Sequence, residues 1–141
     1  MCGICGIIGA ADGREEVLKR MMDAMRHRGP DGGDAYLSGK AALGFRRLSI
    51  IDLDQGMQPM YNETGSRVLV FNGEIYNYRE LREVLLKKGH VFRSNSDSEV
   101  LLHGYEEYGT RMLLKLRGMF GFAVWDEETG ELFAARDFFG I

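Results

Sequence analysis

The chain has few cysteines and few prolines, only two of each among 141 residues. Two cysteines are too few for the disulfide framework of a small secreted domain, so a reducing, cytoplasmic setting is the default expectation. Scarce proline beside 19 glycines indicates tight turns and close backbone approaches, and it argues against a disordered linker.

Long apolar runs and an excess of positive charge are also missing. The apolar stretch from Ile4 to Ala11 is too short to span a bilayer and has no basic region before it, so we expect no membrane association. The formal net charge is −3, and the 18 basic residues are scattered along the chain. This distribution argues against a nucleic-acid partner, because phosphate backbones are bound by clustered basic residues.

The pattern of apolar residues predicts one α+β domain over residues 1–141. The strand from Met119 to Trp125 is apolar on both faces and must be covered on both sides, which favours a layered α/β/β/α sandwich. Helices are expected after the capping-box pairs Asp12–Glu15 and Ser96–Glu99 and near Asn77. The expected strands are 4–8, 35–38, 41–48, 67–71, 119–125 and 131–136.

Position 2 carries the first candidate for chemistry. Removal of Met1 would leave Cys2 with a thiol and a free α-amine on one residue. The amine has an ordinary pKa of about 7.7–8.0 and can serve as the base for the thiol, as in N-terminal nucleophile enzymes. Two alternatives stay open: Cys2 simply follows the start codon, or Met1 is retained and the capped residue is inert.

Seven short motifs follow one another in an order that resembles a known family. The order resembles the class II glutamine amidotransferase domain at the N-terminus of glutamine-hydrolysing asparagine synthetases, from Cys2 to the last residue. The resemblance implies the α/β/β/α sandwich of N-terminal nucleophile hydrolases, C-terminally incomplete because the last strands of the family domain are missing. The motifs are Cys2-Gly3-Ile4, Arg28-Gly29-Pro30-Asp31-Gly32, Arg47-Leu48-Ser49-Ile50, Gln58-Pro59-Met60, Asn72-Gly73-Glu74-Ile75-Tyr76-Asn77, Ser96-Asp97-Ser98-Glu99 and Gly118-Met119-Phe120.

The resemblance also implies a reaction. The sulfur of Cys2 would attack the side-chain carbonyl of glutamine, form a γ-glutamyl thioester and release ammonia, and hydrolysis would then release glutamate. The side-chain amide of Asn72 and the backbone N–H of Gly73 would form the oxyanion hole, where a single donor is typically worth about 2.7–4 kcal/mol. A plainer interpretation of Asn72-Gly73 is a turn between two strands.

Charged residues in the same motifs would hold the two charges of glutamine. The guanidinium of Arg47 would bind the α-carboxylate, while its neighbour Arg46 is interpreted as a surface charge. Asp97, and with less support Glu74, would bind the α-ammonium. Asp97 also has a purely structural interpretation as a first-turn acid that interacts favourably with the helix dipole. The loop from Arg26 to Gly32 is expected near the pocket.

No metal site is expected. Cys2 and Cys5 have a Cys-x-x-Cys spacing, but a zinc site needs two further ligands. The three histidines, His27, His90 and His103, are scattered and offer no pair in the sequence. Cys5 is therefore interpreted as a buried thiol on the first strand.

The chain stops at Asp137 to Ile141, in an apolar segment with no helix cap or polar tail, which predicts a piece of a longer protein. By the resemblance, the partners are glutamine and a synthetase domain that converts aspartate to asparagine. ATP and Mg²⁺ would bind in that missing domain, so no cofactor is expected in this one. Two alternatives stay open: an inactive fragment that self-associates, for example as a homodimer through exposed sheet edges, or a domain that serves another ammonia acceptor.

Overall fold

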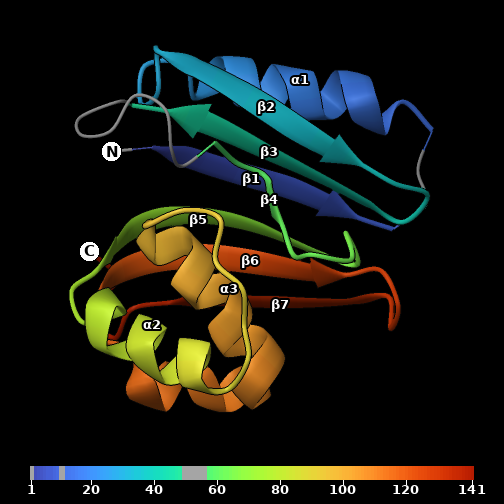
Figure 1. Ribbon diagram of the computed structural model, residues 1–141. Coiled ribbons are helices and arrows are strands. Elements are labelled where there is room, and N and C mark those ends of the chain that lie inside the picture. The colour runs from blue at the N-terminus through green and yellow to red at the C-terminus, as the bar shows by residue number, and fades with distance from the viewer. Residues whose placement is uncertain (1, 10–11, 49–56) are drawn as a thin grey trace.

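The computed structural model describes residues 2–9, 12–48 and 57–141, which fold into four layers (Figure 1). Helix α1 covers a three-stranded sheet, which packs on a four-stranded sheet whose far face carries the remaining helices. The predicted α/β/β/α sandwich is confirmed. The elements are β1 Gly3–Ile8, α1 Arg14–Ala24, β2 Gly32–Leu37, β3 Ala41–Arg47, β4 Met60–Tyr61, β5 Arg67–Ile75, α2 Tyr78–Lys87, α3 Asp97–Tyr108, the 3₁₀ helix η1 Gly109–Lys115, β6 Gly118–Asp126 and β7 Glu131–Arg136.

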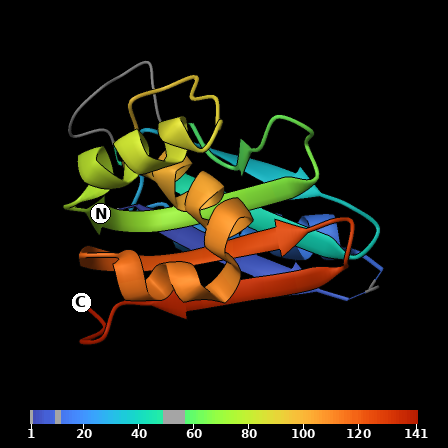
Figure 2. The same ribbon diagram turned by 60° about the horizontal axis from the view of Figure 1, so that its bottom comes forward.

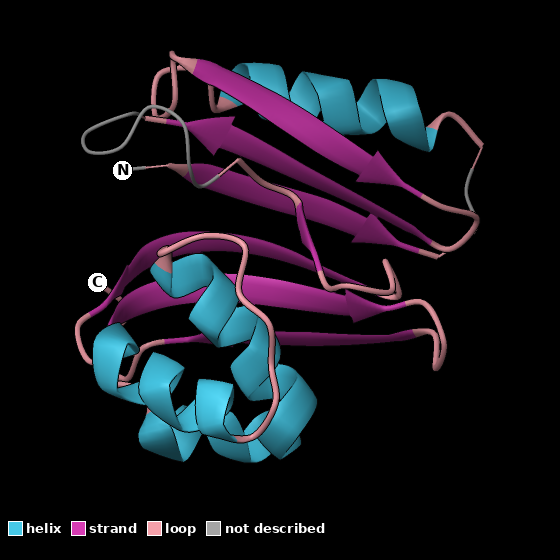
Figure 3. Cartoon of the chain, in the orientation of Figure 1, coloured by secondary structure: helices cyan, strands magenta, loops and turns pink. Residues whose placement is uncertain are grey.

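Both sheets are antiparallel (Figure 3). The first has the strand order β1-β3-β2 and the second the order β4-β5-β6-β7. Strand β3 is therefore central in its sheet, with α1 on one face and the second sheet on the other. This position explains why the run Ala41–Phe45 is buried on both faces.

Strand β5 contributes to both hydrophobic cores through the alternation of its side chains. Val68 and Val70 point between the two sheets, whereas Leu69, Phe71 and Ile75 pack under the helices. Figure 2 shows these helices together on one face of the four-stranded sheet. Each fully buried side chain of this kind contributes roughly 1.5–3 kcal/mol. The inter-sheet core is completed by Ala41, Leu43, Phe45 and Trp125.

The start of α1 differs from the prediction. The N-cap is Gly13, in a left-handed conformation with φ 74°, and no side chain caps the helix, so the capping-box prediction for Asp12 and Glu15 is wrong. The helix start is instead anchored by Arg14, whose guanidinium donates to the carbonyls of Gly9, Ser38 and Gly39 at 2.5–2.9 Å.

The start of α3 agrees with the prediction in part. The Oγ of Ser96 accepts a hydrogen bond from the backbone N–H of Glu99 at 3.3 Å, so the N-cap is confirmed. The carboxylate of Glu99 does not return to Ser96. It accepts from the backbone N–H groups of Arg93 and Ser94 at 2.8 and 2.7 Å and so binds the preceding loop to α3. Among the described residues, no helix is long and apolar enough to cross a membrane.

Candidate active site

The predicted site residues lie on elements that meet at one end of the sandwich. The start of β1, the end of β3 and the end of β5 lie on the same side of the molecule (Figure 1). Cys2 precedes β1, Arg47 ends β3, and Asn72 to Glu74 lie near the end of β5. Asp97 begins α3 and is hydrogen-bonded to the last residue of β5. Met1, Ser49 and Ile50 lie outside the described residues.

Cys2 is held by the residue that follows β3 and by the side chain of Arg28. The N–H of Leu48, the residue after β3, donates to the sulfur of Cys2 at 3.5 Å. The Nε of Arg28 donates to the carbonyl of Cys2 at 3.3 Å. The side chain is half-buried against the inter-sheet core, which places the thiol on the face of its sheet that looks toward β5.

The loop before β2 packs against this same end. The N–H of Asp31 donates to the carbonyl of Arg47 at 3.1 Å. A Cβ on Gly29 would lie only 2.5 Å from the carbonyl carbon of Arg46 and 2.6 Å from the nitrogen of Arg47. Only glycine therefore lets the loop lie directly on the end of β3, next to the strand that carries Arg47.

Strand β5 continues through Asn72 and Gly73, so the turn interpretation of this pair is wrong. Gly73 has φ 153°, and a Cβ there would lie 2.2 Å from the carbonyl oxygen of Met119 on β6. Asn72 and Glu74 continue the row of side chains that points between the sheets, because alternate residues of a strand share a face. Their side chains therefore face the sheet that carries Cys2.

The outer edge of β5 presents three alternate N–H groups, and side chains bind two of them. The N–H of Phe71 donates to the Oε1 of the buried Gln58 at 2.5 Å, and that of Ile75 donates to the Oδ2 of Asp97 at 2.9 Å. The N–H of Gly73 lies between them along the same edge. Its partner in the register, Phe120, directs its own N–H and carbonyl to Asp137, away from Gly73. The pairing of β5 with β6 therefore does not use the Gly73 N–H.

Asp97 combines a structural hydrogen bond with an unfavourable electrostatic position. Burial raises the pKa of its carboxyl group; the backbone N–H groups of Ile75, Ser98 and Asp97 itself oppose this rise, and the nearby charge of Glu74 adds to it. The half-buried carboxylate of Asp97 and the exposed carboxylate of Glu74 beside it favour a cation between them. Asp97 is also the first residue of α3, so the helix-dipole interpretation is compatible with this geometry.

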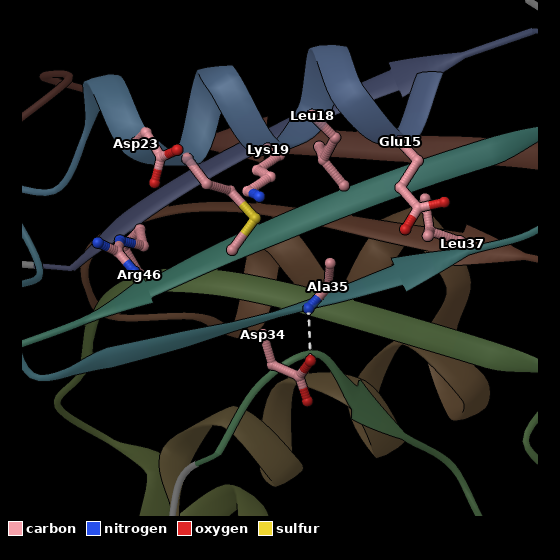
Figure 4. Close-up of a pocket in the computed structure, with 9 residues that line it drawn as sticks. Glu15, Leu18, Lys19, Asp23, Asp34, Ala35, Leu37 and Arg46 are labelled. Carbon is pink, nitrogen blue, oxygen red and sulfur yellow. Dashed lines mark hydrogen bonds between the residues drawn. The ribbon is translucent and has the colours of Figure 1, made fainter. Parts of the chain in front are cut away.

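The two neighbouring arginines face opposite sides of their sheet. Arg47 shares the inter-sheet face with Phe45, and its Nη1 lies 3.6 Å from the sulfur of Met57. Arg46 points under α1 into a cavity of about 310 Å³, towards the end of the helix that carries Asp23 (Figure 4). Its Nε is buried and has no hydrogen-bond partner among the described residues, and the residue as a whole is half-buried, so Arg46 is not a fully exposed surface charge.

Cys5 is a free thiol that is half-buried, so its interpretation as a buried residue is confirmed only in part, and burial raises its pKa. It lies opposite Gly44 on the face of the sheet under α1, whereas Cys2 faces the other sheet. The two thiols therefore do not share a site. The histidines offer no pair in the sequence, but the fold brings two of them together: the rings of His90 and His103 lie 5.0 Å apart. The sequence carries no signal that His90 and His103 meet. It shows only that His103 and Glu106 have the spacing of three that puts them on one face of a helix.

Comparisons with known proteins agree on one family. The profile described as "Glutamine amidotransferase domain" matches residues 1–141. Over 146 residues the chain is 46% identical to asparagine synthetase [glutamine-hydrolyzing] 2 of Bacillus subtilis (strain 168), covering 100% of this chain and 19% of that protein. Over 144 residues it is 41% identical to asparagine synthetase [glutamine-hydrolyzing] 1 of Arabidopsis thaliana, covering 100% of this chain and 24% of that protein.

A solved structure shares the fold. Glutamine phosphoribosylpyrophosphate amidotransferase of B. subtilis, complexed with ADP and GMP, superposes with a TM-score of 0.80 at 22% identity, covering 99% of this chain and 38% of that chain. The chain thus spans only about a fifth to a quarter of the curated relatives that it matches.

Proposed function

Because the chain belongs to the glutamine amidotransferase domain family, we propose that it hydrolyses glutamine to glutamate and ammonia with Cys2 as the nucleophile. The observation that carries the proposal is the edge of β5, where Gln58 and Asp97 bind the N–H groups on either side of Gly73. The end of β5 lies beside the paired strands β1 and β3, where Cys2 precedes β1 and Arg47 ends β3. The arrangement offers a nucleophile on one sheet and an oxyanion donor on the other.

In a chain that begins at Cys2, the α-amine takes the thiol proton, and the sulfur attacks the side-chain carbonyl of glutamine. The resulting oxyanion receives hydrogen bonds from the amide of Asn72 and the N–H of Gly73. The C–N bond breaks, the amine returns its proton to the leaving nitrogen, and ammonia departs. Water then attacks the γ-glutamyl thioester, which releases glutamate and restores the thiol.

Residues around the nucleophile recognise the two charged ends of the substrate. The guanidinium of Arg47 binds the α-carboxylate, supported by its position on the inter-sheet face next to the Cys2 strand. Asp97 and Glu74 bind the α-ammonium, which relieves the repulsion between their carboxylates. The reaction needs no cofactor, since every proton and electron pair comes from Cys2, glutamine and water.

The ammonia is intended for a separate acceptor domain. The relatives are named as asparagine synthetases, so we propose an ATP- and Mg²⁺-dependent domain that makes asparagine as the acceptor. The compartment is the cytoplasm, in keeping with two free thiols.

A second candidate is an inactive fragment that self-associates, for example as a homodimer. The observation that favours it is an apolar groove of about 260 Å³ between the sheets, lined by residues of the edge strands β1 and β7. Strand edges of this kind pair readily with a second chain.

Glutamate release measured by a coupled assay tests the proposal. Cys2→Ala should abolish it while the folded far-UV spectrum is kept, and Cys5→Ala, the matched thiol control, should retain it. Turnover in Cys2→Ala at the parent rate would exclude Cys2 as the nucleophile.

The arginine pair gives a second control. Arg47→Ala should raise the KM for glutamine about 10- to 100-fold, the range expected from losing a hydrogen bond to a charged group. Arg46→Ala, which alters only the α1 side of the sheet, should leave KM near the parent value. A KM that does not change in Arg47→Ala would mean that the α-carboxylate is bound elsewhere.

A further inference from the structure

Two histidines and a glutamate from separate elements come together beside α3. His90 lies in the connection between α2 and α3, and His103 and Glu106 lie one turn apart on α3. One ligand atom from each of the three lies within 4.8 Å of the others. The α2–α3 connection runs alongside α3, which explains how residues 13 and 16 positions apart meet (Figure 1).

Both imidazole rings direct the same nitrogen at the same oxygen. The Nδ1 of His103 lies 2.8 Å from the Oε2 of Glu106, and the Nδ1 of His90 lies 3.9 Å from that oxygen. The other oxygen of Glu106 accepts from the amide of Asn62, which is itself buried, at 2.8 Å. Three potential ligand atoms therefore converge, and the hydrogen bond from Asn62 fixes the orientation of the Glu106 carboxylate.

The remaining nitrogen of each ring faces carboxylates. The Nε2 of His90 lies 3.3 Å from Glu107, and the Nε2 of His103 lies 3.7 Å from both Glu63 and Glu99. A carboxylate on the outer nitrogen is the usual partner of a histidine that binds a metal through its inner nitrogen. His103 is 2% exposed, and its Nε2 has no hydrogen bond among the described residues.

The local charge favours a dication. Four carboxylates surround the two rings, from Glu63, Glu99, Glu106 and Glu107. In the described part of the chain, the cations within 4 Å of these carboxylates, the histidines aside, are Arg67 and Lys88. Arg67 also pairs with Asp126 and Glu128, so carboxylates outnumber the cations here and favour the binding of a divalent ion.

We propose that His90, His103 and Glu106 bind a divalent first-row transition-metal ion, preferably Zn²⁺, through Nδ1, Nδ1 and Oε2, with water as the fourth ligand. Imidazole and carboxylate are ordinary zinc ligands, at about 2.0–2.2 Å from the ion. Tetrahedral ligands at that distance are roughly 3.3 Å apart, so closure requires mainly a movement of His90 towards α3. Binding displaces the proton shared by His103 and Glu106 to solvent.

The ion would act as a clamp. It would tie the α2–α3 connection to α3, and it takes no part in glutamine hydrolysis. This inference does not depend on the proposed function, because it rests only on the cluster beside α3.

The test uses the full chain with both thiols removed, Cys2→Ala together with Cys5→Ala, so that cysteine cannot bind the probe. Zn²⁺ affinity is measured by competition with a chromophoric chelator, and one ion per chain is expected. His90→Ala and Glu106→Gln should each weaken binding by more than about 100-fold, and Glu107→Gln by about 10- to 100-fold. His27→Ala is the matched control, since His27 is exposed and remote in sequence, and it should bind as the parent does.

Thermal unfolding gives a second measurement. Saturating Zn²⁺ should raise the Tm of the parent, because an ion that binds only the folded state stabilises it, and should leave the Tm of His90→Ala unchanged. His90 is the residue of choice because it is less buried than His103 and its loss leaves the α3 core intact. The inference is overturned if the thiol-free chain binds no zinc at one ion per chain, or if His90→Ala binds as tightly as the parent.

Discussion

The two ends of β5 hold their polar groups in opposite ways. At the first residue, Arg67 lies 3.1 Å from Asp126, 3.6 Å from Glu106 and 3.6 Å from Glu128, so a cation is surrounded by its counter-charges. At the other end, the pairing with β6 leaves the N–H of Gly73 unused, and Asp97 and Glu74 repel each other.

If the proposed function is right, the difference separates an end that stabilises the fold from an end that holds the substrate. Groups that pair within the protein stabilise the fold, whereas groups left without a complement are available to a substrate. Substitutions at the Arg67 end should therefore change the free energy of unfolding, and those at the Gly73 end should change catalysis.

The largest effect is expected from Asn72→Ala. Loss of one oxyanion-hole donor should lower kcat about 10²- to 10³-fold, equivalent to about 2.7–4 kcal/mol of transition-state stabilisation. The free energy of unfolding should change far less, because the side chain is only half-buried at the edge of the inter-sheet core. Steady-state kinetics and urea unfolding of the same preparation separate the two effects. A normal kcat in this variant would remove Asn72 from the proposed mechanism.

Arg67→Met should produce the reverse pattern. Removing the guanidinium leaves the buried carboxylate of Asp126 without its cationic partner, and breaking such pairs costs about 3 kcal/mol in unfolding free energy. The kinetic constants for glutamine should stay near those of the parent, since Arg67 lies at the opposite end of the strand. Arg67→Lys is the control that keeps the charge and should lose less stability. If Arg67→Met lowered kcat and left the unfolding free energy unchanged, the assignment of the Arg67 end of β5 to stability would be wrong.

Ser96→Ala should have a smaller effect, on stability alone. The substitution removes the N-cap of α3, which is typically worth about 1 kcal/mol. Urea unfolding measures this loss directly. No change in the unfolding free energy would mean that the Glu99 contacts with the preceding loop hold the helix start by themselves.

Asp97→Asn should give the smallest change in the free energy of unfolding, and this change should depend on pH. Burial raises the pKa of Asp97, so the folded state holds its proton more tightly than the unfolded state does. The contribution of the group is therefore greatest below the unfolded pKa, about 3.9, and is lost as the pH rises through the folded pKa. Asn keeps the acceptor for Ile75 without this loss, so its stability relative to the parent should increase from pH 3.5 to pH 7.

The same variant separates the structural from the catalytic role of Asp97. The KM for glutamine should rise in Asp97→Asn at pH 7, because the α-ammonium loses a counter-charge. An unchanged KM would leave Asp97 with only its hydrogen bond to Ile75 and its place at the helix start.

Strands and helices with clear periodicity were predictable from the sequence, and the layered fold followed from the doubly apolar strand that ends at Trp125. The continuation of β5 through Asn72-Gly73 was not predictable, because that dipeptide is a strong turn signal. Its conformation depends on the close approach of β6, a contact between residues about 46 positions apart. The position of α1 was predictable but its capping was not, because Arg14 anchors the helix start through carbonyls distant in sequence.

Site residues were predictable only where a motif named them. The family motifs nominated Cys2, Arg47, Asn72, Glu74 and Asp97, but not why the pairing of β5 with β6 leaves the N–H of Gly73 unused. That explanation required the side chains of Gln58 and Asp97 on the same strand edge. The pairing of His90 with His103 was hidden for a similar reason, since it depends on how the α2–α3 connection lies along α3.

The most direct test of the account is the intact mass of the chain after incubation with diazo-oxo-norleucine, a glutamine-like electrophile. The account predicts one adduct on a chain that begins at Cys2, located on Cys2 by peptide mapping and absent from Cys2→Ala. It also predicts that added glutamine protects Cys2 and that Cys5 stays unlabelled. A chain that begins at Cys2 and gains no adduct, or one labelled on Cys5 instead, would contradict the assignment of this end of the sandwich as the active site.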